Sequence, residues 1–282
     1  MNEEVIIANE AGLEETKKKI LEAGSENFHV LADFDNTLTK QFADGQKSHT
    51  TIAQLRNGNY LTSDYPGKAH ALFDKYNSIE IDPNVSLDEK KEKMREWWTA
   101  HFKLLADSGL NKKDVEKVVA ERDLNFREGS MEFLYFLHEN NIPLVIMSAS
   151  GLGDAISMYL KKENRLYNNV HVVSNFFEYD AEGNFIRAKE PIIHSLNKDE
   201  TAIQSFPVFD FVKHRKNVLL LGDGLGDVGM VKGFDYDNLI KIGFLNKNTE
   251  ENLENYKKNF DVTILNDGSM DYVNKLVKEV MK

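Results

Sequence analysis

Two aspartates stand two residues apart in VLADFDNTLTK, at the end of the apolar run FHVLADFD (28–35). Residues two apart on a strand point to the same side, so Asp33 and Asp35 are expected to converge at the carboxyl end of that strand. Open α/β sheets bind their ligands at this edge. Such a pair can supply a nucleophile, a proton donor or ligands for a hard cation. An isolated D-x-D is explained equally well by turn or helix-capping aspartates, so the interpretation depends on companion residues.

A second acidic pair lies in LLLGDGLGDVGM, where Asp223 and Asp227 follow another apolar run. Several carboxylates gathered at strand ends would hinder each other's ionisation, and a hard cation such as Mg²⁺ relieves that repulsion. The glycines also invite a dinucleotide-binding interpretation. That interpretation is disfavoured because the spacing is G-x-G-x-G, the motif lies late in the chain, and the carboxylates would repel a pyrophosphate.

Two further residues have the chemistry of phosphate ligands. Ser148 follows the apolar residues of IPLVIMSAS (142–150), and Lys198 stands in HSLNKDETA. A hydroxyl, the backbone N–H groups at the start of a following helix and an ammonium can all donate to phosphate oxygens. Taken alone, Ser148 is more simply a helix cap and Lys198 a solvated surface charge.

The elements that must position these residues alternate along the chain. Apolar runs without polar alternation are typical of strands buried on both faces of a parallel sheet. Helical patterns separate several of the runs, for example at 131–141 and 153–164. The pattern predicts an α/β fold, a three-layer Rossmann-like core with a mostly parallel sheet. The runs themselves are 28–35, 142–150, 170–177, 217–224, 239–245 and 260–267.

The segment 45–130 breaks this alternation, because it contains helical patterns and no convincing buried strand. Ser86 and Glu89 have the S-x-x-E spacing of a capping box, and Asn111 is a good cap for a later helix. We therefore expect a core formed by residues 1–44 and 131–282, with residues 45–130 inserted as a helical cap.

Composition limits the possible partners and compartment. The chain has 282 residues, 41% of them hydrophobic, a net charge of −11 and no cysteine. The acidic balance and the lack of a basic stripe disfavour nucleic acid as a partner. No apolar run approaches the roughly 18 residues of a membrane helix, and no signal peptide is visible. We expect a soluble cytoplasmic protein with no membrane partner; the oligomeric state stays open, with a monomer favoured.

Taken in order, D-F-D-x-T, S-A, a lone Lys and G-D-x-x-G-D resemble the haloacid dehalogenase-type phosphohydrolases. From about residue 28 to the C-terminus the chain is also similar to the cytosolic pyrimidine 5'-nucleotidases, the type III cytosolic family. The segments that carry this resemblance are ADFDNTLTK, IEIDP, EWWT, NNIPLVIMSA, VVSNFFEYDAEGNF, IIHSLNK, LLLGDGLGD and IKIGFLN.

The resemblance implies a Mg²⁺-dependent hydrolysis of nucleoside 5'-monophosphates to nucleoside and phosphate. It implies that Asp33 attacks phosphorus to form an aspartyl phosphate and that Asp35 acts as general acid and base. It further implies Mg²⁺ ligation by the Asp33 carboxylate, the Asp35 carbonyl and Asp223, with Asp227 outside the ligand set. Contacts to the phosphoryl oxygens would come from Ser148, the Ala149 amide and Lys198.

The same resemblance makes the insertion a cap that closes over the substrate. Glu80 of IEIDP matches the glutamate that recognises the base, and Trp98 of EWWT matches the aromatic residue that stacks on it. Tryptophan at this position resembles the branch that also accepts 7-methylguanosine monophosphate, whose charged base would gain a cation–π contact. Adjacent helix residues diverge by about 100°, so Trp97 and Trp98 cannot both face one ligand.

Three features depart from the family pattern. SASGLGD carries one more residue than the usual S-A-G-x-G-D, which could alter the phosphate loop. His101 stands where relatives carry a small residue. The segment 46–58 lacks an evident second aromatic to sandwich a base.

Two alternatives remain beside the nucleotidase. One is a phosphoserine phosphatase-like or other small-molecule phosphomonoesterase, since GDGLGD also resembles that motif. The other is a non-catalytic phosphoacceptor module, which Asp35 argues against because such a site needs no general acid. Base preference and any phosphotransferase activity are left open by the sequence.

Overall fold

A computed structural model describes residues 4–82, 84–149, 152–198, 203–204, 206–232 and 235–282. Its centre is a seven-stranded sheet in which only the edge strand β1 runs antiparallel to its neighbour. In spatial order the strands are β1 (Val5–Ile7), β11 (Val262–Leu265), β10 (Asn238–Leu245), β9 (Asn217–Gly222), β2 (Phe28–Ala32), β5 (Leu144–Met147) and β6 (Val170–Val173).

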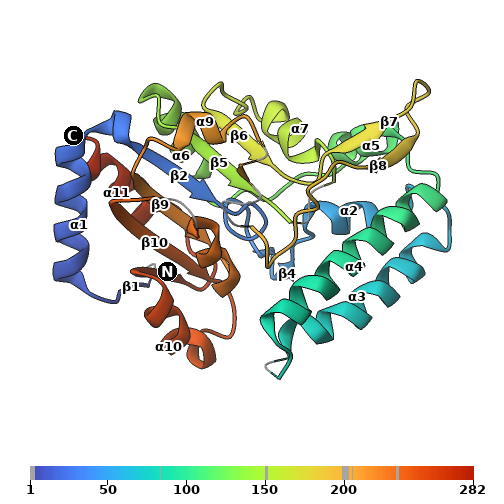
Figure 1. Cartoon of the computed structure of the whole chain (residues 1–282), viewed down its shortest axis with the longest axis horizontal. Coiled ribbons are helices and arrows are strands. Elements are labelled where there is room, and N and C mark those ends of the chain that lie inside the picture. The colour runs from blue at the N-terminus through green and yellow to red at the C-terminus, as the bar shows by residue number, and fades with distance from the viewer. Residues whose placement is uncertain (1–3, 83, 150–151, 199–202, 205, 233–234) are drawn as a thin grey trace.

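Helices cover both faces of this sheet, which gives three layers (Figure 1). Val30 and its neighbours on one face pack against α1 (Glu10–Ala23), α6 (Ser130–Glu139), α7 (Ala155–Lys162) and α11 (Asp271–Val280). Leu31 and the other face pack against α9 (Phe209–Val212), the 3₁₀ helix η2 (Leu225–Val231) and α10 (Thr249–Asn259). A short 3₁₀ turn, η1 (Ser25–Asn27), leads into β2. The predicted α/β sandwich with a mostly parallel sheet is confirmed.

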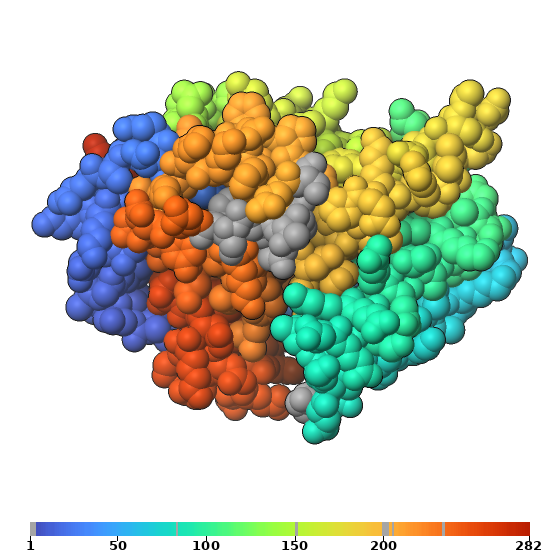
Figure 2. Space-filling model, in the orientation of Figure 1, coloured from blue at the N-terminus to red at the C-terminus, as the bar shows by residue number. Residues whose placement is uncertain are grey.

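The segment between β2 and α6 is mainly helical. It contains two-residue strands β3 (Phe42–Ala43) and β4 (Gln46–Lys47), then α2 (Thr51–Asn57), α3 (Tyr65–Ile81), α4 (Leu87–Asp107) and α5 (Lys112–Glu121). The paired helices α3 and α4 project beside the C-terminal half of the chain (Figures 1 and 2).

Both predicted helix caps of this segment are formed. The Ser86 hydroxyl accepts from the Glu89 amide at 3.3 Å. The Asn111 side chain accepts from the Lys113 amide at 3.0 Å, and Asp114 accepts from the Asn111 amide at 2.8 Å. These bonds satisfy amides that have no partner within their helix.

The apolar run 170–177, expected as one strand, is divided in the structure. β6 ends at Val173, and β7 (Phe177–Tyr179) pairs instead with β8 (Phe185–Ala188) in a separate hairpin. Asn175 is fully buried between the two and bonds with the backbone of Ile193 through both its carbonyl and its amide group, at 2.8 Å each. A buried asparagine whose side chain forms hydrogen bonds with another backbone segment lies where the strand pairing stops. The apolar composition of the run did not reveal this interruption.

This hairpin belongs to the same hydrophobic cluster as the helical segment. Phe177 and Phe185 pack with Trp98, Phe102 and residues of α2 and α5. The amide of Lys112 donates to the carbonyl of Gly183 at 2.8 Å, which ties the hairpin turn to the start of α5. None of the described helices combines the length and the apolar character needed to cross a membrane.

The buried His101 predicts an acid-sensitive stability. It lies on α4 with its Nε2 3.4 Å from the Tyr65 hydroxyl, and burial, aided by the charge of Arg56, lowers its pKa to about 4. An unfolded histidine has a pKa of about 6.5, so the unfolded chain binds more protons between these values. The free energy of unfolding should therefore fall as the pH falls through this window, by at most about 3 kcal/mol from this residue.

Urea unfolding at several pH values across this window should show that the free energy of unfolding falls less on acidification in His101→Gln than in the wild type. His70→Gln, which changes an exposed histidine of α3, is the matched control and should keep the wild-type slope. If the free energy of unfolding depended on pH equally in the two variants, His101 would not be the source of the acid sensitivity.

Candidate active site

Adjacent strands bring the first and last acidic motifs together. Ala32 of β2 lies opposite Leu221 of β9, and the amide of Asp33 donates to the carbonyl of Leu221 at 3.0 Å. Each strand ends directly before its aspartate, and the two strands are parallel. Asp33 and Asp223 therefore leave the sheet at the same edge. Asp33, Asp223 and Asp227 each present a carboxylate oxygen within 4.8 Å of the others.

Lys198 lies against this cluster. Its Nζ donates to Asp33 Oδ1 and, at 3.2 Å, to Asp227 Oδ1. Lys198 is only 7% exposed, so the alternative that it is a solvated surface charge is wrong. The lysine is 165 positions from Asp33 in the chain, and the fold alone brings the two side chains together.

The charges of the cluster do not balance. Burial raises the pKa of Asp33, and Asp227 adds to that effect while Lys198 opposes it. Burial also raises the pKa of Asp223 well above its usual range, with further repulsion from Asp33 and Asp227. Burial disfavours the charged form of Lys198, but its carboxylate neighbours outweigh burial and raise its pKa. Among the described residues one ammonium faces three carboxylates, so the site attracts further positive charge.

The loop after β9 is shaped by close backbone contacts. A Cβ atom on Gly222 would lie 2.4 Å from the Asp227 Cβ, so only glycine lets Asp227 fold back over the strand end. Asp227 Oδ2 accepts from the Gly224 amide at 2.9 Å, while its other oxygen accepts from Lys198. The Tyr256 hydroxyl of α10 donates to the Asp223 carbonyl, which fixes the backbone of that residue.

Asp35 does not join the carboxylate cluster. β2 ends at Ala32, so the alternation of a strand no longer governs residues 33–35, and the Asp35 carboxylate lies outside the group formed by Asp33, Asp223 and Asp227. Instead, Asp35 Oδ1 accepts from the amide and the hydroxyl of Thr51, at 3.0 and 3.3 Å. Thr51 is the first residue of α2, so this carboxylate is held at the start of the helical segment.

Ser148 and Ala149 leave the sheet beside Asp33. β5 neighbours β2 on the side away from β9, and Ile146 lies opposite Ala32. The Ser148 amide donates to the Val173 carbonyl at 3.0 Å, and the Ala149 carbonyl accepts from Asn175 Nδ2 at 3.1 Å. The effect of the extra residue in SASGLGD concerns Ser150 and Gly151, which lie outside the described residues.

A cavity of about 690 Å³ opens beside the carboxylates of Asp223 and Asp227, whereas Asp33 is not among the described residues that line it. Lys198, Asp223 and Asp227 line one side of it, and Glu80, at the end of α3, lines another. Glu80 accepts a hydrogen bond from the Ser195 hydroxyl, which lies three residues before Lys198. The cavity thus joins the helical segment to the edge of the sheet and could hold a phosphorylated small molecule.

Trp98 is not among the described residues that line this cavity. Its indole is 8% exposed and packs against Phe102 and His101, with ring centroids 5.4 and 5.7 Å away. Trp97 is half-buried and stacks on Tyr76 at 6.1 Å. The structure therefore brings Glu80 to the cavity and leaves Trp98 in the hydrophobic cluster of the helical segment.

Sequence reasoning missed several residues that hold the site in place. Asn36 donates a side-chain hydrogen bond to Asp223 and has a left-handed backbone, with φ 65°. An asparagine directly after the D-x-D pair was the available signal, because asparagine tolerates this conformation. Thr51, Ser195 and Tyr256 contact the site over long sequence separations and gave no local signal.

The donor set suits a divalent cation. Carboxylate oxygens are the preferred ligands of hard cations, and the unbalanced negative charge of the cluster would be offset by one. Asp33 and Asp223 could ligate it directly, whereas both Asp227 oxygens already accept hydrogen bonds.

Known proteins resemble this chain along nearly its whole length. The sequence model of the pyrimidine 5'-nucleotidase (UMPH-1) family matches residues 36–281. A 7-methylguanosine phosphate-specific 5'-nucleotidase of Gallus gallus is 35% identical over 94% of this chain and 91% of its own length. The Homo sapiens protein of the same name is 32% identical over 100% of this chain and 94% of its own length.

Solved structures agree with these sequence matches. Cytosolic 5'-nucleotidase IIIB, solved bound to cytidine, superposes with a TM-score of 0.91 at 29% identity, covering 98% of this chain and 93% of its own. Phosphoserine phosphatase in its apo form has a TM-score of 0.54 at 16% identity, covering 87% of this chain and 96% of its own, which shows a shared fold.

A divalent cation should stabilise the protein through this cluster. Mg²⁺ at a hundredfold excess over its dissociation constant should raise the free energy of unfolding by about 2.7 kcal/mol, because only the folded chain assembles the carboxylates. Thermal unfolding with Mg²⁺ and with EDTA measures the shift. Asp223→Asn should lose most of it, whereas Asp210→Asn, at an exposed position, should keep it. An equal shift in both variants would place the bound cation elsewhere.

Proposed function

The chain belongs to the pyrimidine 5'-nucleotidase family, and from this premise we propose how its own residues divide the work of the reaction. The enzyme is a phosphoric monoester hydrolase that converts nucleoside 5'-monophosphates to nucleoside and phosphate through an aspartyl-phosphate intermediate. The observation that carries the assignment of residues is the buried bridge of Lys198 between Asp33 and Asp227, beside a cavity that Glu80 also lines.

We assign the nucleophile to Asp33. A carboxylate oxygen of Asp33 attacks phosphorus as the bond to the nucleoside O5' breaks, and Asp35 gives its proton to that oxygen. In the second step Asp35 takes a proton from water, the water oxygen attacks phosphorus, and phosphate leaves with Asp33 restored. The bonds from the amide and hydroxyl of Thr51 support this role for Asp35, since they hold its carboxylate in one orientation beside Asp33 in the chain.

Mg²⁺ is the proposed cofactor, held by the Asp33 carboxylate, the backbone carbonyl of Asp35 and Asp223. When bound it offsets the repulsion between the anionic nucleophile and the phosphate dianion. Asp227 is assigned to orienting Lys198, because its oxygens are taken up by Lys198 and the Gly224 amide. Tyr256 and Asn36 support the assignment of Asp223, since they fix its backbone and its carboxylate.

Ser148, the Ala149 amide and Lys198 are the proposed ligands of the phosphoryl oxygens. Donors aimed at these oxygens stabilise the charge that spreads over them in the transition state. The position of Ser148 and Ala149 beside Asp33 at the sheet edge supports this assignment.

The helical segment is proposed to select the leaving group. We divide the chain into a core of residues 1–44 and 131–282 and a cap of residues 45–130, which closes over the substrate and excludes water. Glu80 would accept hydrogen bonds from the base, and its position in the cavity supports this. Trp98 is the proposed stacking residue; it packs against His101, so base stacking requires these rings to separate.

The proposed substrates are pyrimidine nucleotides such as UMP and CMP, together with 7-methylguanosine monophosphate. The matched family and the curated relatives are named for these two classes. We propose that the protein acts in the cytoplasm on small molecules, with no nucleic-acid or membrane partner. The name of the cytosolic 5'-nucleotidase IIIB and the net charge of −11 support this setting.

Phosphate release from a substrate panel tests the proposal. With Mg²⁺ the enzyme should prefer UMP, CMP or 7-methylguanosine monophosphate to AMP, GMP and phosphoserine, and EDTA should stop turnover. Asp33→Asn should lower kcat by more than about a thousandfold, because the amide cannot form the acyl phosphate. Substantial activity in Asp33→Asn would remove the covalent role, and a preference for phosphoserine would remove the nucleotide assignment.

Glu80→Gln tests recognition of the base. Replacing a charged hydrogen-bond acceptor should cost about 1.5–3 kcal/mol, so kcat/KM for the preferred nucleotide should fall about 10- to 100-fold. Hydrolysis of p-nitrophenyl phosphate, which has no base, should change little. Glu92→Gln, an exposed position on α4, is the matched control. An equal loss on both substrates would show that Glu80 acts on the phosphate chemistry instead.

A further inference from the structure

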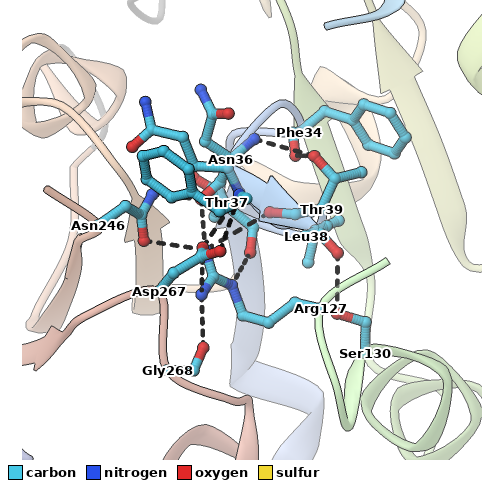
Figure 3. Close-up of polar contacts among 12 residues, drawn as sticks. Phe34, Asn36, Thr37, Leu38, Thr39, Arg127, Ser130, Asn246, Asp267 and Gly268 are labelled. Carbon is cyan, nitrogen blue, oxygen red and sulfur yellow. Dashed lines mark hydrogen bonds and ion pairs between the residues drawn. The ribbon is translucent and has the colours of Figure 1, made fainter. Parts of the chain in front are cut away.

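Arg127 is the largest fully buried side chain among the residues that the structure describes. It lies between α5 and α6, where the chain returns from the helical segment to the sheet. Its guanidinium points into the turn that follows Asp35 (Figure 3). A buried guanidinium is costly unless every donor finds an acceptor, so its contacts define what it does.

The four consecutive backbone carbonyls of residues 36–39 all accept hydrogen bonds from Arg127, and one of them also accepts from Ser130. Arg127 Nε donates to the Thr37 carbonyl at 2.8 Å, and Nη2 donates to the carbonyls of Asn36 and Thr39 at 2.5 and 3.4 Å. The Leu38 carbonyl accepts from the Arg127 amide and from the Ser130 hydroxyl, each at 2.9 Å. The whole turn 36–39 is therefore fixed by Arg127 and Ser130.

The same guanidinium holds two other strand ends. Nη2 donates to Asn246 Oδ1 at 3.1 Å, after β10. Nη1 donates to the Gly268 carbonyl and lies 3.2 Å from Asp267 Oδ1, after β11. The plane of the group also stacks over Phe244 at 4.1 Å. One side chain thus joins the ends of β2, β10 and β11.

Asn36 connects this arrangement to the carboxylate cluster. Its carbonyl is bound by Arg127 and also by Asn246 Nδ2 at 2.9 Å. With the backbone fixed, the Asn36 side chain is directed at the Asp223 carboxylate. Asp35 is the preceding residue, so the placement of both Asp35 and Asp223 depends on the same turn.

We propose that Arg127 is a positioning residue that sets the geometry of the cation-binding carboxylates through the turn 36–39. It touches neither substrate nor cation and acts through Asn36 and Asp35. The inference rests on the proposed function for the identity of the reaction, and on the contacts of the turn for the role of Arg127.

Arg127→Ala, with and without free guanidinium, tests the proposal. The variant should bind Mg²⁺ about 10- to 100-fold more weakly in calorimetry, the range seen when groups that orient metal ligands are removed. The kcat for the preferred nucleotide should fall by a similar factor, with KM changing far less, because the base contacts are untouched. Low concentrations of guanidinium chloride should restore part of kcat and of Mg²⁺ affinity, whereas equal sodium chloride should not.

Arg215→Ala is the matched control. Arg215 also donates from Nη1 to backbone carbonyls beside β2, those of Ser25 and Phe28, at 3.0 and 2.9 Å, but at the opposite end of the strand. It should lower the unfolding temperature without changing kcat or Mg²⁺ affinity. If Arg127→Ala folds and keeps wild-type Mg²⁺ affinity, or if both variants lose it equally, Arg127 has only a structural role.

Asn36→Gly decides the question if Arg127→Ala fails to fold. Glycine accepts the left-handed backbone of position 36, so the carbonyl bonds to Arg127 survive while the contact with Asp223 is lost. Weaker Mg²⁺ binding in this variant supports the proposal, and wild-type binding overturns it. A wild-type enzyme inactive on all nucleotides would refute the proposed function, while the Mg²⁺ affinities would still test Arg127.

Discussion

The rest of this structure depends on holding three carboxylates together beside one buried ammonium. Asp33, Asp223 and Asp227 repel one another, and little water screens them because Asp33 and Asp227 are buried and Asp223 is half-buried. Lys198 offsets part of that repulsion, and the site keeps a net negative charge. The arrangement is unfavourable for an inert core and well suited to a site that must receive a cation and a phosphate, which is how strained electrostatics and function are commonly linked.

The fold maintains this arrangement with backbone contacts around each carboxylate. Gly222 lets Asp227 approach the strand end, Tyr256 holds the carbonyl of Asp223, and Thr51 holds Asp35 at the start of α2. Arg127 fixes the turn 36–39, which directly follows Asp35. Groups that must bind a cation at short range need such support, because small displacements of the ligands weaken binding sharply.

The helical segment and the sheet edge share the cavity, so the proposed substrate selection and the proposed catalysis would be linked. Glu80 reaches the cavity from α3 and is bound by Ser195, three residues before Lys198. Asp35 is bound by Thr51 of α2, so a shift of the helices would move the proposed proton donor as well as the proposed base-recognition residue. The proposed stacking residue Trp98 is buried against His101 and does not line this cavity.

Local pattern in the sequence determined the parallel sheet, the caps at Ser86 and Asn111, and the placement of Asp33 and Asp223 at strand ends. These features depend on residues a few positions apart, where strand and helix periodicity and capping chemistry act. Only the tertiary structure decided that Lys198 is buried, that Asp35 turns to Thr51, and that Asn175 divides the run 170–177. It also placed Arg127 beneath the turn of Asn36, some 90 positions away. Contacts across such separations depend on which strand ends become neighbours, and no local periodicity encodes that.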